Sequence, residues 1–186
     1  MVPDFRVLCV STYDRTRSPL IAALLRAEVA RRELRLDVAT AGIVATGGRV
    51  TYEVSVHLQS RDIDVQAHRA QLLLESHVRE SGLVLTTDPE HVTNIVSRWP
   101  EAYPKTFTMC ELVALAGRVG GRLGDALSAW TPLLHAGRPP IERYPTTASG
   151  VDHLRLVEPP SGDRDAWTQL FDTADELCQR LVKALD

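Results

Sequence analysis

The sequence predicts a three-layer α/β/α fold, in which a mostly parallel, roughly four-stranded twisted sheet lies between layers of helices. Two observations indicate this fold. Short runs of apolar, β-prone residues alternate along the chain with segments whose apolar residues recur at helical spacing. A long segment near the C-terminus, 167–185, also carries its leucines on one side of a helix. Such alternation favours parallel strands, because a crossover helix is needed to bring the chain back for the next strand.

The expected strands are short apolar runs at residues 7–10, 38–43, 83–86 and 105–108. The expected helices lie at residues 19–34, 52–61, 76–80, 88–98, 109–116 and 167–185. Two of them have a clear start signal. Pro19 suits the first turn of a helix, where its missing N–H costs nothing. Asp88 can cap the helix that follows it, because its side chain accepts from unpaired N–H groups.

The whole chain, residues 1–186, is expected to form one domain, since domains typically have about 100–200 residues. The stretch at about 117–153 differs from the rest. It is rich in glycine, proline, arginine and serine, and it contains a helical segment at 123–135. We interpret this stretch as an insertion or long excursion at the edge of the sheet.

Composition limits the possible partners and cofactors. The net charge of −3 gives no electrostatic case for a nucleic-acid partner. The cysteines Cys9, Cys110 and Cys178 are far apart and form no C-x-x-C pair, which argues against a disulfide framework or a zinc site. No stretch approaches the roughly 20 apolar residues that span a bilayer, and residues 1–6 lack a signal-peptide pattern. We therefore expect a cytoplasmic protein without a metal, another cofactor or a membrane partner.

The candidate site is the polar turn between the first expected strand and helix. It consists of Ser11, Thr12, Tyr13, Asp14, Arg15, Thr16, Arg17 and Ser18. In an open parallel sheet, ligands bind beyond the carboxyl ends of the strands, and the start of a helix attracts anions. Two arginines and several hydroxyl groups suit a phosphate. The pattern predicts a phosphate-binding loop, and the alternative is an ordinary polar loop that ends in a helix cap.

This segment resembles the start of the low-molecular-weight protein tyrosine phosphatases, which have a strand, then Cys-x5-Arg-Ser/Thr-Pro, then a helix. Further fragments are similar to the family in order and spacing: Ala41-Gly42, Ile63-Asp64, the Ala-His-Arg-Ala of residues 67–70, and Val157-Glu158-Pro159. The resemblance covers the chain except about 117–153. It implies hydrolysis of phosphomonoesters through a cysteinyl-phosphate, with an arginine to hold the phosphate and a carboxylic acid to protonate the leaving group.

Four positions depart from the family pattern when the chain is aligned on Arg-Ser-Pro. Ser11 replaces the nucleophilic cysteine, Tyr13 a glycine, Asp14 an asparagine, and Glu158 the aspartic acid. A serine needs an adjacent base to become a nucleophile, and none is evident in the loop sequence. Tyrosine tolerates fewer backbone shapes than glycine, and Asp14 is expected to bring a negative charge beside the phosphate.

The resemblance therefore implies a phosphatase-like protein that binds phosphate or a phosphorylated ligand and is weakly active or inactive. Arg17 would hold the phosphate and Glu158 would be the acid. We expect that Ser11→Cys alone restores little activity. The ligand would be phosphate, phosphotyrosine or a small phosphoester, and the oligomeric state is left open.

Other functions remain open at this point. One is an active hydrolase that uses Cys9 or an unusual serine mechanism. Cys9 also begins a Cys-x5-Arg-Thr pattern, in which Cys9 would be the nucleophile, Arg15 would hold the phosphate and Glu158 would be the acid. The competing interpretation is that Cys9 is a buried strand residue. An arsenate reductase would share the fold, but Cys110 and Cys178 have no visible resolving role. A non-catalytic partner-binding module is the fourth possibility.

Overall fold

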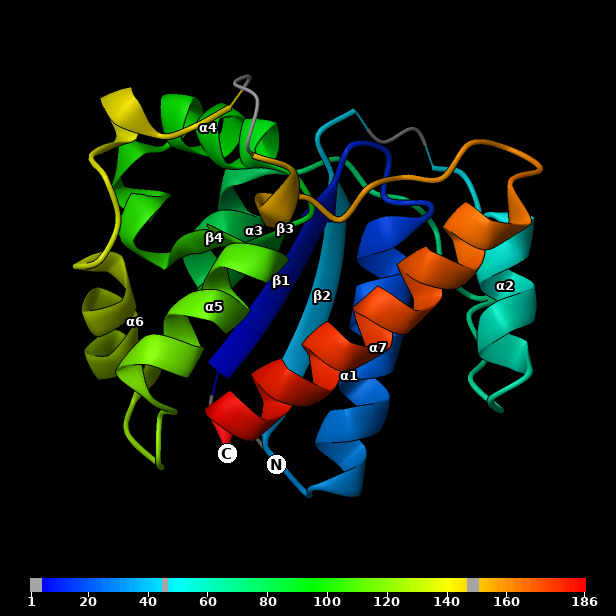
Figure 1. Ribbon diagram of the computed structural model, residues 1–186, viewed down its shortest axis with the longest axis horizontal. Coiled ribbons are helices and arrows are strands. Elements are labelled where there is room, and N and C mark those ends of the chain that lie inside the picture. The colour runs from blue at the N-terminus through cyan, green and yellow to red at the C-terminus, as the bar shows by residue number, and fades with distance from the viewer. Residues whose placement is uncertain (1–4, 45–46, 147–150) are drawn as a thin grey trace.

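A computed structural model describes residues 5–44, 47–146 and 151–186. Its centre is a sheet of four parallel strands, in the order β2-β1-β3-β4 (Figure 1). The strands are β1 (Phe5–Ser11), β2 (Leu36–Gly42), β3 (Leu83–Thr86) and β4 (Thr106–Thr108). The predicted α/β fold with a four-stranded parallel sheet is confirmed.

The register of the strands sets the position of the loop that follows β1. Cys9 lies opposite Thr40 on one side and Leu85 on the other, so β1 is paired on both edges. Ser11 lies opposite Gly42 at the last paired position of β1 and β2. The carboxyl ends of the central strands therefore meet at one edge of the sheet, where ligands bind in folds of this kind.

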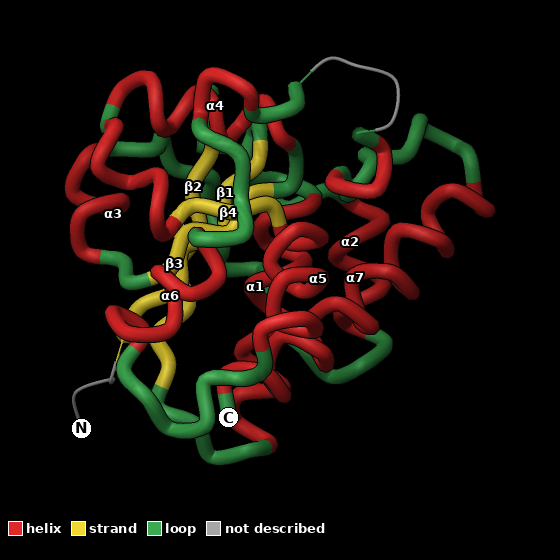
Figure 2. The backbone as a smooth tube through the Cα atoms, turned by 60° about the vertical axis from the view of Figure 1, so that its left-hand side comes forward, coloured by secondary structure: helices red, strands yellow, loops and turns green. Residues whose placement is uncertain are grey.

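Alternate residues of β1 face two separate cores. Val7 and Cys9 pack with helices α1 (Arg17–Arg31), α2 (Tyr52–Gln59), α5 (Met109–Val119) and α7 (Arg164–Leu185). Leu8 and Val10 pack with residues of α3 (Glu75–Glu80) and α4 (Pro89–Arg98) on the opposite face. Figure 2 shows the strands between these two groups of helices. This double burial explains why the strand reads as a continuous apolar run.

A cap and a turn account for two differences between the observed and the predicted helix boundaries. Helix α7 begins at Arg164, earlier than predicted, because the Asp163 carboxylate accepts from the N–H of Ala166 at 3.0 Å. Helix α6 (Leu127–His135) begins later than predicted, because Leu123 and Gly124 have positive φ and lie in a turn. Asp88 caps α4 as predicted, accepting from the N–H of Glu90 at 3.1 Å.

Residues of the stretch 117–153 are anchored to α5 and to the edge of the sheet through one buried arginine. Arg138 donates from Nε and Nη2 to the two carboxylate oxygens of Glu111, at 2.8 and 3.1 Å. Its guanidinium lies over the rings of Tyr103 and Phe107, each at 4.3 Å. Tyr144 donates its hydroxyl to Glu111 at 2.8 Å. In the described residues, no helix is both long and apolar enough to cross a membrane.

Candidate functional site

The segment 11–18, here called the β1–α1 loop, crosses the carboxyl edge of the sheet. Neighbouring segments hold its backbone: the carbonyl of Ser11 accepts from the N–H of Ile43 at 3.0 Å, and that of Arg15 from the N–H of Thr51 at 2.9 Å. The carbonyl of Thr16 accepts from the N–H of Leu20 at 3.1 Å, which extends the first turn of α1. The loop is therefore fixed at both ends and at its middle.

A buried set of polar groups lies beneath the loop, and we call it the Asp14 network. The Asp14 side chain is fully buried. One of its carboxylate oxygens, Oδ1, accepts from the Ser18 hydroxyl at 2.9 Å. The other, Oδ2, accepts from the Thr40 hydroxyl and from the Gln71 N–H, both at 3.1 Å. Ser18 Oγ in turn lies 2.7 Å from Ser11 Oγ. The network thus links Ser11 to a carboxylate through one intervening hydroxyl.

The backbone of Asp14 is left-handed, with φ of 53°. Aspartate tolerates this conformation better than most residues, because its short side chain can hydrogen-bond locally. His68 Nε2 lies 2.8 Å from the Asp14 carbonyl oxygen and 3.7 Å from its carboxylate. Burial raises the pKa of Asp14, and the hydrogen bond from Gln71 N–H and the nearby His68 oppose this rise.

These observations correct two expectations about the loop. The sequence predicts that Asp14 brings a negative charge beside the phosphate, but its carboxylate is turned into the network under the loop, where three donors bind it. Tyr13 is exposed and its φ is not positive, so the position requires no glycine. Neither Tyr13 nor Asp14 therefore has the effect on the loop that the sequence predicts.

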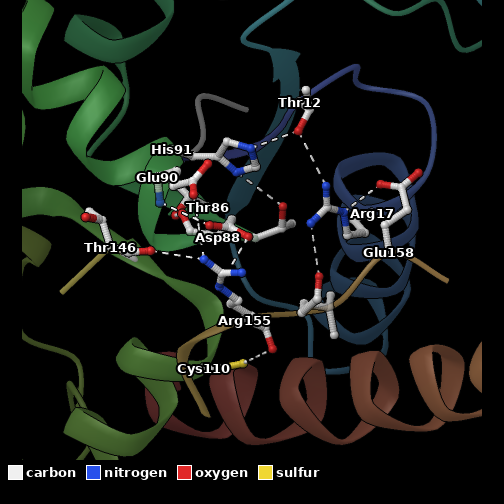
Figure 3. A network of polar contacts seen from close by, with 12 residues as sticks. Thr12, Arg17, Thr86, Asp88, Glu90, His91, Cys110, Thr146, Arg155 and Glu158 are labelled. Carbon is white, nitrogen blue, oxygen red and sulfur yellow. Dashed lines mark hydrogen bonds and ion pairs between the residues drawn. The ribbon is translucent and has the colours of Figure 1, made fainter. Parts of the chain in front are cut away.

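A second set of contacts, the Arg17 network, lies over the loop (Figure 3). Arg17 donates from Nε to Glu158 Oε2 at 2.8 Å and from Nη1 to the Leu156 carbonyl at 3.1 Å. Its Nη2 reaches Thr12 Oγ1 only at 3.5 Å. The arginine side chain is 8% exposed and that of Glu158 is 39% exposed. The structure thus brings the predicted Arg17 and Glu158 together from opposite ends of the chain.

His91 on α4 joins this network, although sequence reasoning gave it no role. Its Nε2 lies 3.0 Å from Thr12 Oγ1, and its Nδ1 lies 3.4 Å from Thr87 Oγ1. Burial, and secondarily the cation of Arg17, lowers the pKa of His91 to about 4. The imidazole is therefore neutral near pH 7, and both of its nitrogens lie near hydroxyl groups.

The segment that carries Glu158 is held over the edge of the sheet by its main chain and by Arg155. The N–H of Leu156 donates to the Thr87 carbonyl at 2.9 Å. The Arg155 guanidinium lies 3.7 Å from carboxylate oxygens of both Asp88 and Glu90, at the start of α4 (Figure 3). Sequence reasoning missed Arg155, because nothing in the local sequence shows that it faces two acids more than sixty positions earlier in the chain.

The structure contradicts the alternative in which Cys9 is the nucleophile. Cys9 lies inside β1 with no exposed surface, and burial raises the pKa of its thiol to about 12. Its proposed partner Arg15 is an exposed residue whose Nε donates to the Arg49 carbonyl at 2.9 Å. A thiol in the centre of a sheet can neither ionise readily nor reach a ligand. Cys9 is a core residue.

Three comparisons relate this arrangement to known proteins. A family model described as "Low molecular weight phosphotyrosine protein phosphatase" matches residues 6–129. The chain belongs to this family. Its curated relatives include the protein-arginine-phosphatase of Geobacillus stearothermophilus, which is 33% identical over 143 residues, or 74% of this chain and 89% of the relative. The resemblance inferred from the loop and the later fragments is thereby confirmed.

Solved phosphatases of this family have the same fold. The YwlE arginine phosphatase from Geobacillus stearothermophilus is 25% identical, with a TM-score of 0.66 over 96% of this chain and 91% of that chain. A YwlE mutant with serine in place of cysteine, described with a phosphorylated active-site serine, is 23% identical, with a TM-score of 0.69 over 96% of this chain and 93% of that one. The family assignment thus agrees with the tertiary structure as well as with the sequence.

Proposed function

We propose that the β1–α1 loop binds the phosphate group of a phosphorylated protein side chain, and that hydrolysis of this ligand is slow or absent. The observation that carries the proposal is a set of backbone donors. In the part of the chain that the structure describes, several loop N–H groups donate to no protein acceptor, namely those of Thr12, Tyr13, Arg15, Thr16, Arg17 and Ser18. Neighbouring N–H groups of this kind at the start of a helix form an anion-binding site.

The Arg17 side chain supports the same proposal. It is a nearly buried guanidinium, and its present acceptors are a half-exposed carboxylate, a carbonyl and a long contact to Thr12. A phosphate oxygen can replace the Glu158 carboxylate on Nε without leaving Arg17 unpaired, because arginine binds both groups through the same planar donors. The Glu158 carboxylate is then no longer paired with Arg17 and lies beside the ligand.

Slow hydrolysis follows from the nucleophile. A serine hydroxyl stands at position 11, where the family mechanism uses a thiolate, and a hydroxyl is both harder to ionise and a poorer leaving group. In the YwlE mutant with the same substitution, the serine is described as phosphorylated. This precedent supports a site that holds a phosphoryl group better than it releases one. A phosphorylated protein side chain is the ligand class suggested by the names of the family and of the arginine phosphatase relative.

Isothermal titration with inorganic phosphate tests the proposal. Arg17→Gln should weaken phosphate binding about 10- to 100-fold, because a hydrogen bond to a charged group contributes about 1.5–3 kcal/mol. The matched control is Arg180→Gln, which removes an exposed arginine on α7 and should leave the affinity unchanged. If the two variants bind phosphate as the unmodified protein does, or if none of the three binds, the proposal is wrong.

A further inference from the structure

The hydrogen-bond donors and acceptors around Asp14 determine the direction of the bond between Ser11 and Ser18. An ionised carboxylate can only accept, and Asp14 accepts the single hydroxyl proton of Ser18. Ser18 Oγ can then take part in the 2.7 Å contact only as an acceptor, so Ser11 must be the donor. The N–H of Asp14 donates to Ser11 Oγ at 3.2 Å, which occupies an acceptor site on Ser11. The Ser11 proton therefore points along a chain of hydroxyls that ends at a carboxylate.

An asparagine at position 14, as in the family pattern, would give the opposite direction. An amide has one accepting oxygen and one donating nitrogen. Thr40 and Gln71 both donate to the Oδ2 side, so the amide oxygen would have to lie there and the amide nitrogen would face Ser18. Ser18 would then donate toward residue 11. A thiolate at position 11 would accept that hydrogen bond. The bond found here, in which Ser11 is the donor, suits a hydroxyl that must lose a proton.

We propose that Ser11 is a phosphoryl acceptor and that Asp14, acting through Ser18, receives its proton. This inference rests on the proposed function, since the phosphorylated ligand must first bind in the loop. In the step, a bond forms between Ser11 Oγ and phosphorus while the bond from phosphorus to the leaving oxygen breaks. The Ser11 proton moves to Ser18 Oγ, and the Ser18 proton moves to Asp14 Oδ1. The products are phosphoserine at position 11, a neutral Asp14, and the leaving group, which for an aryl phosphate is a phenolate.

The surroundings of Asp14 favour this transfer. Burial raises the pKa of Asp14, so its carboxylate is a stronger proton acceptor than one in water. The titratable groups that face it are His68, which opposes the rise, and the thiol of Cys9, which is un-ionised because burial raises its pKa to about 12. Protonation also removes a charge from a fully buried position. Relative to the family pattern, the serine at position 11 thus needs a proton acceptor, and the aspartate at position 14 supplies one.

The reaction should stop after one transfer. Hydrolysis of the adduct would require the Ser11 oxygen to leave from phosphorus, and this oxygen leaves far less readily than the thiolate of the family mechanism, even when its proton returns from Asp14 through Ser18. The protein would therefore accumulate as a phosphoserine form, with one equivalent of leaving group released per chain.

The experiment incubates the full chain with 4-nitrophenyl phosphate and follows both released nitrophenolate and the intact mass of the protein. We expect a burst of one equivalent and the mass gain of one phosphoryl group, absent in Ser11→Ala. Asp14→Asn should slow the burst about 10²–10⁴-fold, the usual contribution of a general base. Ser18→Ala should slow it similarly. For the unmodified protein, the rate should rise with pH as Asp14 ionises, and this rise should be missing in Asp14→Asn.

A cysteine background separates the proton relay from a purely structural role of Asp14. In Ser11→Cys, the further change Asp14→Asn should accelerate turnover, because Ser18 can then donate to the thiolate. Thr40→Val serves as the matched structural control: it removes one hydrogen bond to Asp14 but keeps the carboxylate, so it should slow the burst by less than tenfold.

Three outcomes would overturn the inference. If Asp14→Asn slows the serine and cysteine proteins equally, Asp14 is only structural. If phosphate binds with the expected dependence on Arg17 but no adduct forms, the relay is wrong while the proposed function stands. If phosphate does not bind at all, both fail. Circular dichroism melting shows whether each variant is folded. If Asp14→Asn is unfolded, the effect of Ser18→Ala on the burst tests the proton relay instead.

Discussion

The polar side chains beneath the β1–α1 loop and those above it differ in how many of their hydrogen bonds are made within the protein. Beneath the loop, Asp14 is fully buried and binds three donors, at 2.9 and 3.1 Å. Above it, Arg17 is paired with a carboxylate that is 39% exposed, and its contact to Thr12 is 3.5 Å long. Two of the donors to Asp14, Thr40 of β2 and the N–H of Gln71, come from other segments, whereas Glu158 comes from the segment that precedes α7.

This difference indicates that the two networks have different roles in the loop. The lower network fixes the backbone and the direction of the hydrogen bonds, since its buried groups have no alternative partner. The upper network consists of contacts that a ligand can replace, because water or phosphate oxygens can satisfy the same groups. Changes below the loop should therefore have the larger effect on stability, and changes above it should mainly alter ligand binding.

The largest effect is expected from Asp14→Leu. The change leaves the Ser18 and Thr40 hydroxyls and the Gln71 N–H without their acceptor. We expect a loss of about 2–4 kcal/mol in the free energy of unfolding, since each buried unsatisfied group costs about 1–3 kcal/mol and the lost charge offsets part of this. Urea unfolding measures it. The isosteric Asp14→Asn should lose less than about 1.5 kcal/mol, and an equal loss in both variants would contradict the role of these hydrogen bonds.

A smaller effect concerns His91 and the pH dependence of stability. The unfolded chain takes up a proton at this histidine as the pH falls below 6.5, whereas the folded protein does so only near pH 4. The contribution of His91 to the free energy of unfolding is therefore fully present above pH 6.5. It is lost as the pH falls from 6.5 toward 4, by about 1.4 kcal/mol per pH unit at most.

Unfolding curves of the unmodified protein and of His91→Gln between pH 7 and pH 4.5 measure this contribution. The difference between the two proteins should shrink steadily as the pH falls, because glutamine cannot titrate. Taking the difference also removes the opposite contribution of Asp14, whose raised pKa favours the folded state in acid. Parallel curves over the whole range would mean that His91 is not held neutral by its surroundings.

The smallest effect is expected from Glu158→Gln. Removal of the carboxylate leaves Arg17 without its competing anion, so phosphate should bind several-fold more tightly, while stability changes by less than about 1 kcal/mol because the pair is partly exposed. Titration with inorganic phosphate gives the affinity. Glu176→Gln, which removes a similar partner from Arg180, is the matched control. Weaker binding in Glu158→Gln would show that Glu158 supports the anion instead of competing with it.

Much of this site could be located from the sequence, because its signals are local. An apolar run, a polar segment with Arg17, and Pro19 at a helix start indicate a strand, a loop and a helix whatever the rest of the chain does. The pairing of Arg17 with Glu158 needed the resemblance to a family, since 141 positions separate the two residues. His91 and Arg155 could not be found, because their role depends on which segments the fold brings over the edge of the sheet.

Sequence alone thus determined the alternation of strands and helices, the position of the loop and the identity of its first residue as serine. Only the tertiary structure decided what those residues can do. Cys9 and Ser11 are two positions apart on one strand, yet Cys9 lies within the core and Ser11 ends the strand at the loop. The sequence places Asp14 in the phosphate-binding loop, but its left-handed backbone turns its side chain under the loop, where Thr40 and Gln71 from other segments bind it. The reason is physical: the direction of a buried hydrogen bond is set by all the donors and acceptors around it, and these come from segments that the chain brings together only when it folds.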